Sequence, residues 1–232
     1  LREVVFVEQG LVGVNRKEER RRRLLGMAGL ASLALCSVGL LVGWTVSSMR
    51  NGDYVAEVRS RLPEVTRAVD AIPPNSAGGV AEVGGVLADV RAIAQPTGFD
   101  VDDPPWLSTL GLYQGDKLDA GAQIAYEKLL RHTLLPRITL RMEERLRASS
   151  RENLEQAYIA LKCYLMLYSP EHFDPETFKA WISLDWDTQL RNLSEKQRGQ
   201  LDQHLQALLD LGAPIASGKL DGPLVASTRD ML

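Results

Sequence analysis

The chain has 232 residues, 45% of them hydrophobic and 25% charged, which suits one or two domains with a sizeable buried core. Its net charge of −3 is unevenly distributed: residues 1–49 carry seven Lys or Arg and four Asp or Glu, whereas residues 50–232 carry 20 and 26. A net-acidic larger part argues against a nucleic-acid-binding domain, because phosphate neutralisation needs clustered basic side chains. The first residue is leucine and not methionine, so we expect a segment of a larger protein.

The first feature in chain order is a basic cluster followed by a long apolar run. Residues 1–15 contain a short β-prone run and two glycines, and they lead into the basic residues of 16–23. Residues 24–49 then form a stretch of 26 residues without a charge. A helix of that length extends about 39 Å, more than the roughly 30 Å of a bilayer's hydrocarbon core. The run predicts a transmembrane helix over residues 24–49.

Two other interpretations of this run are weaker. A buried core helix is rarely apolar on every face over such a length. A cleaved signal peptide has an apolar region of about 7–15 residues and a small-residue cleavage site. Here 23 residues precede the run, and WTVSSMRN at its end (residues 44–51) is a poor cleavage site.

The charges on either side of the span predict its direction. Six basic residues lie directly before it, and the arginines after it are sparser. We call the six the basic flank; they are Arg16, Lys17, Arg20, Arg21, Arg22 and Arg23. By the positive-inside rule, residues 1–23 are expected to be a cytoplasmic juxtamembrane segment and residues 50–232 a periplasmic domain. Trp44 is expected at the outer interface, where its indole N–H can stay hydrated.

Small residues recur along one face of the span and suggest a packing surface. Gly39 and Gly43 form a GxxxG motif, and the row runs in steps of three or four residues. The proposed packing face consists of Ala28, Ser32, Cys36, Gly39 and Gly43. Small side chains let two membrane helices approach closely, so one interpretation is contact with another span or subunit. The other is chance, since glycine and alanine are common in membrane helices.

The rest of the chain has helical periodicity and no convincing strand series, so the predicted fold class is all-α. An amphipathic helix is expected over residues 53–70, where Pro63 can kink or divide it, and a weaker one follows the breaker cluster at 72–79. Residues 95–106 are typical of a loop, and a sub-boundary is possible near 95–115. Beyond Asp116 a long helical region should bend or break at Pro136. Its apolar positions are Ile124, Leu129, Leu134, Ile138, Met142 and Leu146.

Capping patterns predict where the later helices begin. Ser149 and Glu152 have capping-box spacing before residues 151–168. Ser194 and Gln197 have it before a predicted helix whose apolar positions are Leu201, Leu205, Leu208 and Leu209. Asp174 is expected to cap a helix with proline at its first position. The tail after Pro214 contains Gly, Ser and Pro and is expected to lead into a missing domain.

The residues that usually carry chemistry are scattered. Cys36 and Cys163 are too far apart for a disulfide framework or a metal site, and both are interpreted as structural. The three histidines, 132, 172 and 204, are interpreted as surface or helix-cap residues, and the acidic pairs 102–103 and 143–144 as solvated. No GxSxG, HExxH or phosphate-loop motif occurs, and the aromatic and leucine residues of 158–186 are interpreted as core. We therefore expect no enzyme activity, no cofactor and no metal.

Three blocks carry a resemblance to a known family. They are VVFVEQGLVGVN at residues 4–15, LGLYQGDKLDAGAQIAYEKLLRHTLLPRI at 110–138, and AYIALKCYLMLYSPEHFDPETFKAWISLDW at 157–186. In this order, on either side of a span, they resemble the IcmF/TssM family, the large inner-membrane component of bacterial type VI secretion systems. The related IcmF of type IVB secretion is poorly separated from it by these motifs.

The resemblance implies an architecture larger than this segment. Family members have a pair of membrane helices, a cytoplasmic NTPase-like domain, a further membrane helix and a large periplasmic region. This chain resembles the last membrane helix and the first helical periplasmic part, so no nucleotide-binding residue is carried over. The implied partners are TssL, an IcmH/DotU-like inner-membrane protein, and the outer-membrane lipoprotein TssJ, which would bind a region absent here. Multimerisation is also implied.

Two function classes follow. The first is a structural component that anchors and helps build a trans-envelope channel. The second is a membrane-tethered periplasmic ligand-binding or sensor domain that signals through one span, which would need a pocket with convergent polar groups. A secreted soluble protein is a third possibility and would not stay with the membrane.

Overall fold

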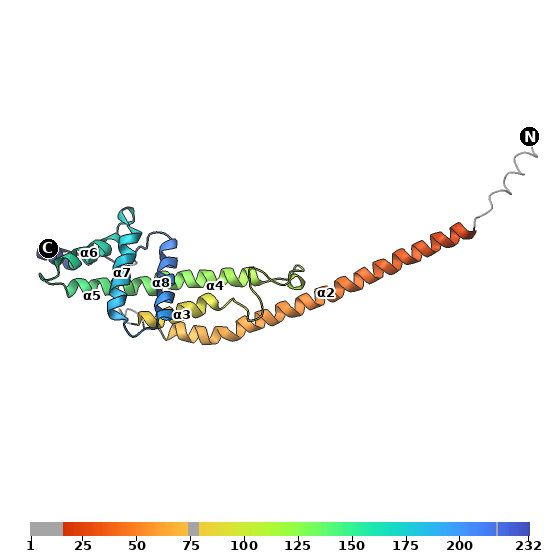
Figure 1. The fold of residues 1–232 in the computed structure, drawn as a ribbon, viewed down its shortest axis with the longest axis horizontal. Coiled ribbons are helices and arrows are strands. Elements are labelled where there is room, and N and C mark those ends of the chain that lie inside the picture. Colours follow the sequence, from red (N-terminus) through yellow and green to blue (C-terminus); the bar gives the residue numbers. More distant parts are fainter. Residues whose placement is uncertain (1–15, 74–78, 217) are drawn as a thin grey trace, which may run out of the picture. The chain divides into compact units, whose positions relative to one another are not determined.

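The described part of the protein consists of helices joined by turns and loops. The computed structural model describes residues 16–73, 79–216 and 218–232, and no strand occurs in these ranges, as the all-α prediction required. The sequence block at 4–15 lies outside them, as does most of the predicted juxtamembrane segment. The helices, with short 3-10 and π segments labelled η, are α2 (Arg16–Asp70), α3 (Val80–Ala92), η2 (Trp106–Ser108), α4 (Gly115–Leu129), η3 (Leu130–Leu134), α5 (Leu135–Arg147), α6 (Leu154–Met166), η4 (Pro170–His172), α7 (Pro175–Gln189), α8 (Glu195–Asp210) and α9 (Gly222–Met231) (Figure 1).

The chain divides into two compact units. Unit 1 contains Leu1–Asp53 and Pro104–Tyr113, and unit 2 contains Tyr54–Asp103 and Gln114–Leu232. The boundary falls within α2, so the apolar part of that helix belongs to unit 1 and its last turns belong to unit 2.

Helix α2 continues through the positions where a separate amphipathic helix was expected. It is one helix from Arg16 to Asp70, and Pro63 lies inside it without dividing it. Within unit 2, Tyr54 and Val58 are buried beside Ile93 and Ala94. Tyr54 Oη also donates a hydrogen bond of 2.6 Å to the carbonyl oxygen of Ala94. We attribute the continuity to this packing, because burial of apolar surface offsets the hydrogen bond that proline cannot donate.

The centre of unit 2 is the run of α4, the π turn η3 and α5, which lie end to end (Figure 1). The N–H of Leu135 donates to the carbonyl of Leu130, five residues earlier, which is the wide turn of a π-helix. Pro136 follows at once, so the helical region predicted to bend or break there accommodates the proline with one wide turn and does not break. Helices α3, α6, α8 and α9 pack against this run.

The core of unit 2 confirms most of the predicted apolar positions. Leu134, Ile138, Met142 and Leu146 are buried in one cluster with residues of α3, α6, α7 and α8. Ile124 is 56% exposed, contrary to the prediction, and Tyr126 occupies the core instead. The two residues are half a helical turn apart, so only one of them can face the core.

Two of the three predicted caps are confirmed. The Asp174 side chain accepts from the N–H of Thr177 at the start of α7, and Ser194 and Gln197 form a complete capping box at α8. The capping box at Ser149 is wrong, because α6 begins at Leu154, after Asn153. The Ser149 hydroxyl instead donates to the carbonyl of Arg145 at 2.9 Å, and so helps to end α5.

The tail after Pro214 contains a helix that the sequence analysis missed. Helix α9 begins at Gly222, with Asp221 as N-cap accepting from the N–H of Leu224 and a proline in its first turn. Leu224 and Val225 are buried in the unit 2 core. The pattern Asp-Gly-Pro before apolar residues is an N-cap signal that could have identified this helix.

Candidate functional site

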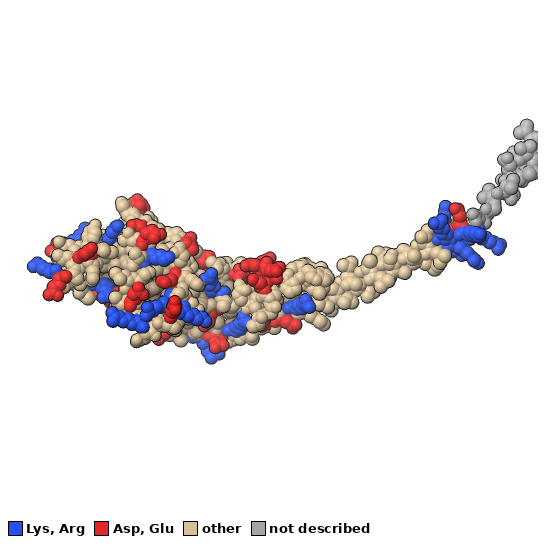
Figure 2. Space-filling model, viewed as in Figure 1, with Lys and Arg blue, Asp and Glu red and all other residues tan. Residues whose placement is uncertain are grey.

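The apolar half of α2 presents an uncharged surface directly after a basic one. Figure 2 shows Lys and Arg gathered at the start of the helix and no charged side chain along the stretch that follows. In the described ranges, α2 is the one helix long and apolar enough to cross a membrane, and none of its most apolar window is buried.

The basic flank lies on the first two turns of α2, and the structure places all six of its side chains in the open. Arg23 is the member nearest to the apolar stretch; its side chain is 76% exposed and pairs with Glu19 at 2.7 Å. The exposed members of the flank are Arg16, Lys17, Arg20, Arg21, Arg22 and Arg23. Their position at the end of the apolar stretch agrees with the predicted flank, and the direction of insertion that they indicate stays a prediction.

The proposed packing face is open over most of its length. Ala28, Ser32, Cys36 and Gly39 are all exposed, and a Cβ added at Gly39 would meet no atom within 4 Å. The Ser32 hydroxyl donates to the carbonyl of Gly29 at 2.9 Å, so its polarity is satisfied within the helix. Such a face can adjoin lipid or a second helix without an unsatisfied donor. Its role in helix packing stays a prediction.

The last member of that face, Gly43, is already in contact with another part of unit 1. A Cβ at Gly43 would lie 3.3 Å from Cδ1 of Leu110, and Gly43 is only half-exposed. One turn further, Ser47 Oγ donates to the carbonyl oxygen of Ser108 at 3.2 Å. Asn51 Nδ2 donates to the same oxygen at 3.0 Å. We call the three buried residues Ser47, Asn51 and Ser108 the polar clip.

The polar clip was missed by the sequence analysis, although part of it has a sequence signal. Ser47 and Asn51 extend the row from Gly43 in steps of four, and so continue the same helical face. All three residues are almost fully buried, at 0% for Ser47, 6% for Asn51 and 3% for Ser108. Their partner Ser108 lies on the loop, 61 residues from Ser47 and 57 residues from Asn51, so no local sequence pattern indicates the pairing.

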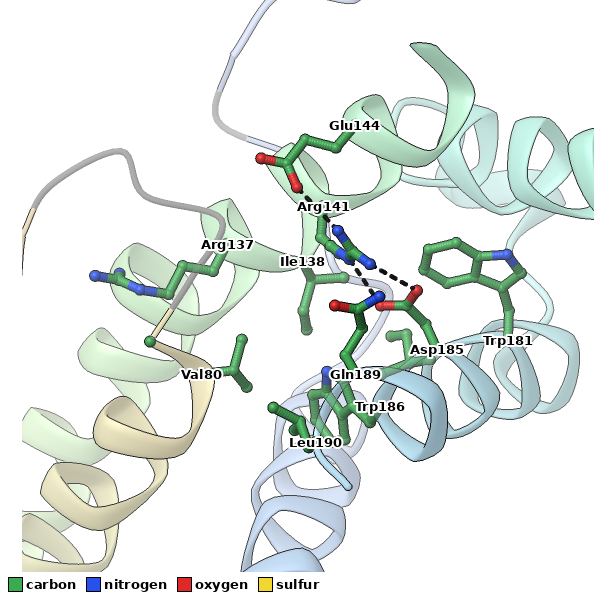
Figure 3. A pocket seen from close by; sticks show the side chains of 12 residues that line it. Val80, Arg137, Ile138, Arg141, Glu144, Trp181, Asp185, Trp186, Gln189 and Leu190 are labelled. Carbon is green, nitrogen blue, oxygen red and sulfur yellow. Dashed lines mark hydrogen bonds and ion pairs between the residues drawn. The ribbon is translucent and has the colours of Figure 1, made fainter. Parts of the chain in front are cut away.

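Unit 2 contains a cavity of about 340 Å³ between the start of α3, α5 and α7. Figure 3 shows Arg141 directed at Asp185 across it, with Trp181 and Trp186 on α7 beside them. Arg141 Nε donates to Asp185 Oδ2 at 3.0 Å, and Arg141 Nη1 pairs with Glu144 Oε2 at 3.0 Å. Because these charged groups are bonded to each other, they tie α5 to α7 and do not converge on the cavity.

His204 is a core residue, which corrects its interpretation as a surface or helix-cap histidine. It is 2% exposed, and its Nδ1 lies 2.8 Å from Tyr126 Oη. Its Nε2 lies 3.1 Å from the carbonyl oxygen of Gly84, so one imidazole connects α3, α4 and α8. Burial lowers the pKa of His204 and raises that of the Tyr126 hydroxyl. His132 and His172 are exposed, as expected.

Glu143 also departs from its predicted solvated state. Its side chain is 15% exposed, pairs with Arg147 at 2.9 Å and accepts a hydrogen bond of 3.1 Å from Tyr164 Oη. Its neighbour Glu144 is exposed, and so are the residues of the acidic pair 102–103. Glu143 therefore joins α5 to α6, a role for which no simple sequence signal exists.

The aromatic and leucine residues of 158–186 are core in the main, as predicted. Tyr164, Phe178 and Ile182 are fully buried, whereas Tyr158 and Leu184 are 59% and 63% exposed. Cys163 is also fully buried, and burial raises the pKa of its thiol to about 12, so it is inert at neutral pH. In the described part of the chain, no group of three or more His, Cys, Asp or Glu side chains could hold a metal ion.

Comparison with known proteins identifies the family. The family model described as "IcmF-related: Intracellular multiplication and human macrophage-killing" matches residues 85–232, which is more than half of the chain. The chain belongs to the IcmF-related family. The match includes the two blocks at 110–138 and 157–186 on which the resemblance rested.

A curated relative of this IcmF-related chain is named type VI secretion system component TssM1 and comes from Pseudomonas aeruginosa strain PAO1. The two sequences are 40% identical over 232 residues. The alignment covers all of this chain, which spans 20% of the relative's length. No solved structure matches the chain.

Proposed function

We propose that this chain is part of a structural inner-membrane component of a bacterial type VI secretion membrane complex. The observation that carries the proposal is the similarity to TssM1, together with an apolar helix that has no cover within the described part of the chain. The helix would anchor the protein, and the helical unit 2 would help to build a trans-envelope channel. The protein would work by geometry and assembly, without catalysis.

The proposed topology has the basic flank of α2 in the cytoplasm and residues 50–232 in the periplasm. The charge asymmetry supports it, because Lys and Arg next to a span are retained on the cytoplasmic side. An impermeant maleimide added to spheroplasts would test the direction. It should label Tyr158→Cys, on the exposed side chain of α6, and should leave Arg20→Cys unlabelled; the reverse pattern would refute the topology.

The proposed partners are TssL in the inner membrane, TssJ through a region outside this segment, and further copies of the same chain. The open face formed by Ala28, Ser32, Cys36 and Gly39 is where a second membrane helix would pack. Gly43 contributes less to it than the sequence suggested, since Leu110 already covers part of that position.

Substitution of Gly39 by leucine tests the packing face. Gly39→Leu adds bulk where the structure leaves open space, so we expect normal membrane insertion but weaker co-purification of tagged and untagged copies and of TssL. Ala34→Leu is the matched control, because residue 34 lies on the opposite side of the helix. Equal co-purification of the two variants and the parent would refute the packing face.

Oxidative crosslinking gives a second readout of the same face. The native Cys36 should form a disulfide between copies, and so should Ala28→Cys, Ser32→Cys or Gly39→Cys in a Cys36→Ala background. Ala34→Cys in that background is the control and should not crosslink. Crosslinking from position 34 as readily as from the face would show unspecific association.

The alternative of a ligand-binding or sensor domain has one feature in its favour, the cavity beside Arg141 and Asp185. Arg141, Glu144 and Asp185 are already paired with one another, and a binding site needs polar groups that converge on the ligand. We therefore favour the structural role. A ligand-bound structure with that cavity occupied would reverse this preference.

A further inference from the structure

The loop segment Pro104–Tyr113 belongs to the same compact unit as the apolar helix, and its composition is unusual for a loop. Its sequence, PPWLSTLGLY, contains no charged residue, and the uncharged run extends over residues 104–115, between Asp103 and Asp116. Trp106 is 72% exposed and Leu110 is 38% exposed. Large apolar side chains in a loop without charges are suited to a bilayer interface and not to bulk water.

The loop is attached to α2 along a defined stretch of the helix. Leu110 lies against Gly43, and the Ser108 carbonyl accepts hydrogen bonds from Ser47 and Asn51. From Gly43 to Asn51 the helix rises about 12 Å. The loop backbone therefore runs beside the last part of the predicted span, residues 43–49, and beside the turn that follows.

Non-helical backbone does not occur against lipid tails, because each unsatisfied N–H or C=O in hydrocarbon costs several kcal/mol. The hydrocarbon layer must then end near Gly43, where the loop first touches the helix. Residues 24–43 number 20 and rise about 30 Å, which equals the thickness of a typical hydrocarbon core. The loop contact and the helix length therefore place the outer edge of the hydrocarbon layer at the same residue, Gly43.

The backbone that carries Trp106 is held in place by the loop's own hydrogen bonds. Trp106 begins the 3-10 turn η2, and its carbonyl accepts from the Thr109 hydroxyl at 2.7 Å and from the Thr109 N–H at 3.2 Å. The N–H of Ser108 donates to the carbonyl of Pro105 at 2.7 Å. The turn is thus closed on itself, and the polar clip joins it to α2 two residues after the tryptophan.

We propose that Pro104–Tyr113 is an interfacial collar that binds the lipid headgroup layer, with Trp106 inserted in it, and that the membrane span ends at Gly43. The partner is the lipid surface itself. Trp44, which is 54% exposed, then lies at the same interface, and residues 44–49 lie in the headgroup layer instead of the hydrocarbon. This proposal rests on the proposed membrane anchoring and refines it.

Nitroxide depth measurements on the full chain in phosphatidylethanolamine–phosphatidylglycerol vesicles test the collar. Spin labels are placed by Trp106→Cys, Met49→Cys, Val42→Cys and Tyr158→Cys, each in a Cys36→Ala background. All four positions carry exposed side chains, so labelling does not disturb the fold. The remaining thiol, Cys163, is buried, and with its pKa raised to about 12 it does not react. Collision rates with apolar oxygen and with a water-soluble nickel chelate report depth.

The collar predicts that the label at 106 collides with the nickel chelate several-fold less often than the label at 158, and shares the headgroup depth of the label at 49. The label at 42 should be deeper and oxygen-rich. Equal exposure of 106 and 158 to the chelate would overturn the collar. A label at 106 shielded from both reagents would also overturn it, because that pattern indicates a protein contact.

The outcome at position 42 separates the two proposals. An oxygen-rich label at 42 with a water-exposed label at 106 would refute the collar and leave the anchoring intact. A label at 42 as exposed to the chelate as that at 158 would refute both, because α2 would not be inserted. A label at 49 at the same depth as that at 42 would return the end of the span to Met49.

Discussion

The close approach of α3 and α8 at Gly84 gives the sharpest test of the unit 2 core. A Cβ built on Gly84 would lie 2.6 Å from Cδ2 and 3.2 Å from Cγ of Leu201, and Leu201 is 2% exposed. A carbon pair needs about 3.5 Å, so either Leu201 must leave its position or the two helices must separate. Separation would also lengthen the 3.1 Å contact between the Gly84 carbonyl and His204 Nε2.

The magnitude follows from two opposing effects on the free energy of unfolding. Overpacking in a core costs about 1–3 kcal/mol, whereas glycine to alanine inside a helix gains about 0.5–1 kcal/mol. We expect Gly84→Ala to destabilise unit 2 by about 0.5–2 kcal/mol. The neighbouring Gly85 is exposed, with nothing within 4 Å of an added Cβ, so Gly85→Ala should stabilise by about 0.5–1 kcal/mol.

Urea unfolding of the full chain in detergent micelles measures both variants. Trp44→Phe and Trp106→Phe in the background leave Trp181 and Trp186, both in unit 2, as fluorescence reporters. The difference between the two glycine variants removes the helix-propensity gain and isolates the overpacking, about 1–3 kcal/mol. Equal stabilisation by both substitutions would refute the close approach. Adding Leu201→Ala to Gly84→Ala should cost less than the sum of the single changes, because the methyl then has room.

Two further predictions concern the buried polar groups. The pKa of His204 is lowered in the folded state, so on acidification the unfolded chain takes up a proton first, and the free energy of unfolding should fall as the pH drops below about 6.5. His204→Gln should flatten the pH dependence of the urea midpoint between about pH 5 and 7.5. A midpoint that rises on acidification would contradict this sign. Asp185→Asn should cost about 1–3 kcal/mol, because Arg141 and Arg145 lose their shared partner, whereas Asp187→Asn, 69% exposed, should change thermal unfolding little.

The sequence predicted the helices whose ends depend on local chemistry. The N-caps at Asp174 and Ser194 are correct because each side chain accepts a hydrogen bond from the backbone N–H three residues later, that of Thr177 or Gln197. Ser149 has the same spacing but failed, because its hydroxyl had a competing acceptor in the helix that it follows. The local pattern is therefore correct where the side chain bonds to the helix that follows it, and wrong where it bonds to the helix before it.

Ile124 was assigned to the wrong face for a different reason. A regular helix drifts in phase over several turns, and the π turn at Leu130–Leu134 adds a residue that resets the phase. With this extra residue, Tyr126, Leu130 and Leu134 line up with Ile138 on one face. Nothing in the sequence besides Pro136 indicates the wide turn. The buried face of α5 therefore could not be extended by regular helical spacing to the residues of α4 that precede the turn.

The candidate site also contains features that local sequence indicates and features that depend on residues far apart in the chain. The basic flank and the small-residue face of α2 could be identified from residue type and helical period alone, and their roles stay predictions. The polar clip was not, because Ser108 is 61 residues from Ser47, and a backbone carbonyl has no residue-type signature. His204 was misjudged likewise, since its partners Tyr126 and Gly84 lie 78 and 120 residues earlier.

The imidazole that joins α3, α4 and α8 has a consequence for biogenesis. Gly84 cannot reach its partner until residue 204 has been synthesised, and at about 5–20 residues per second those 120 residues take roughly 6–24 s. During that interval the apolar faces of α3 and α4 have no α8 to cover them, so they are open to chaperones and proteases. The link between α3, α4 and α8 is therefore among the last contacts of unit 2 that can form, because its imidazole is made after both of its partners.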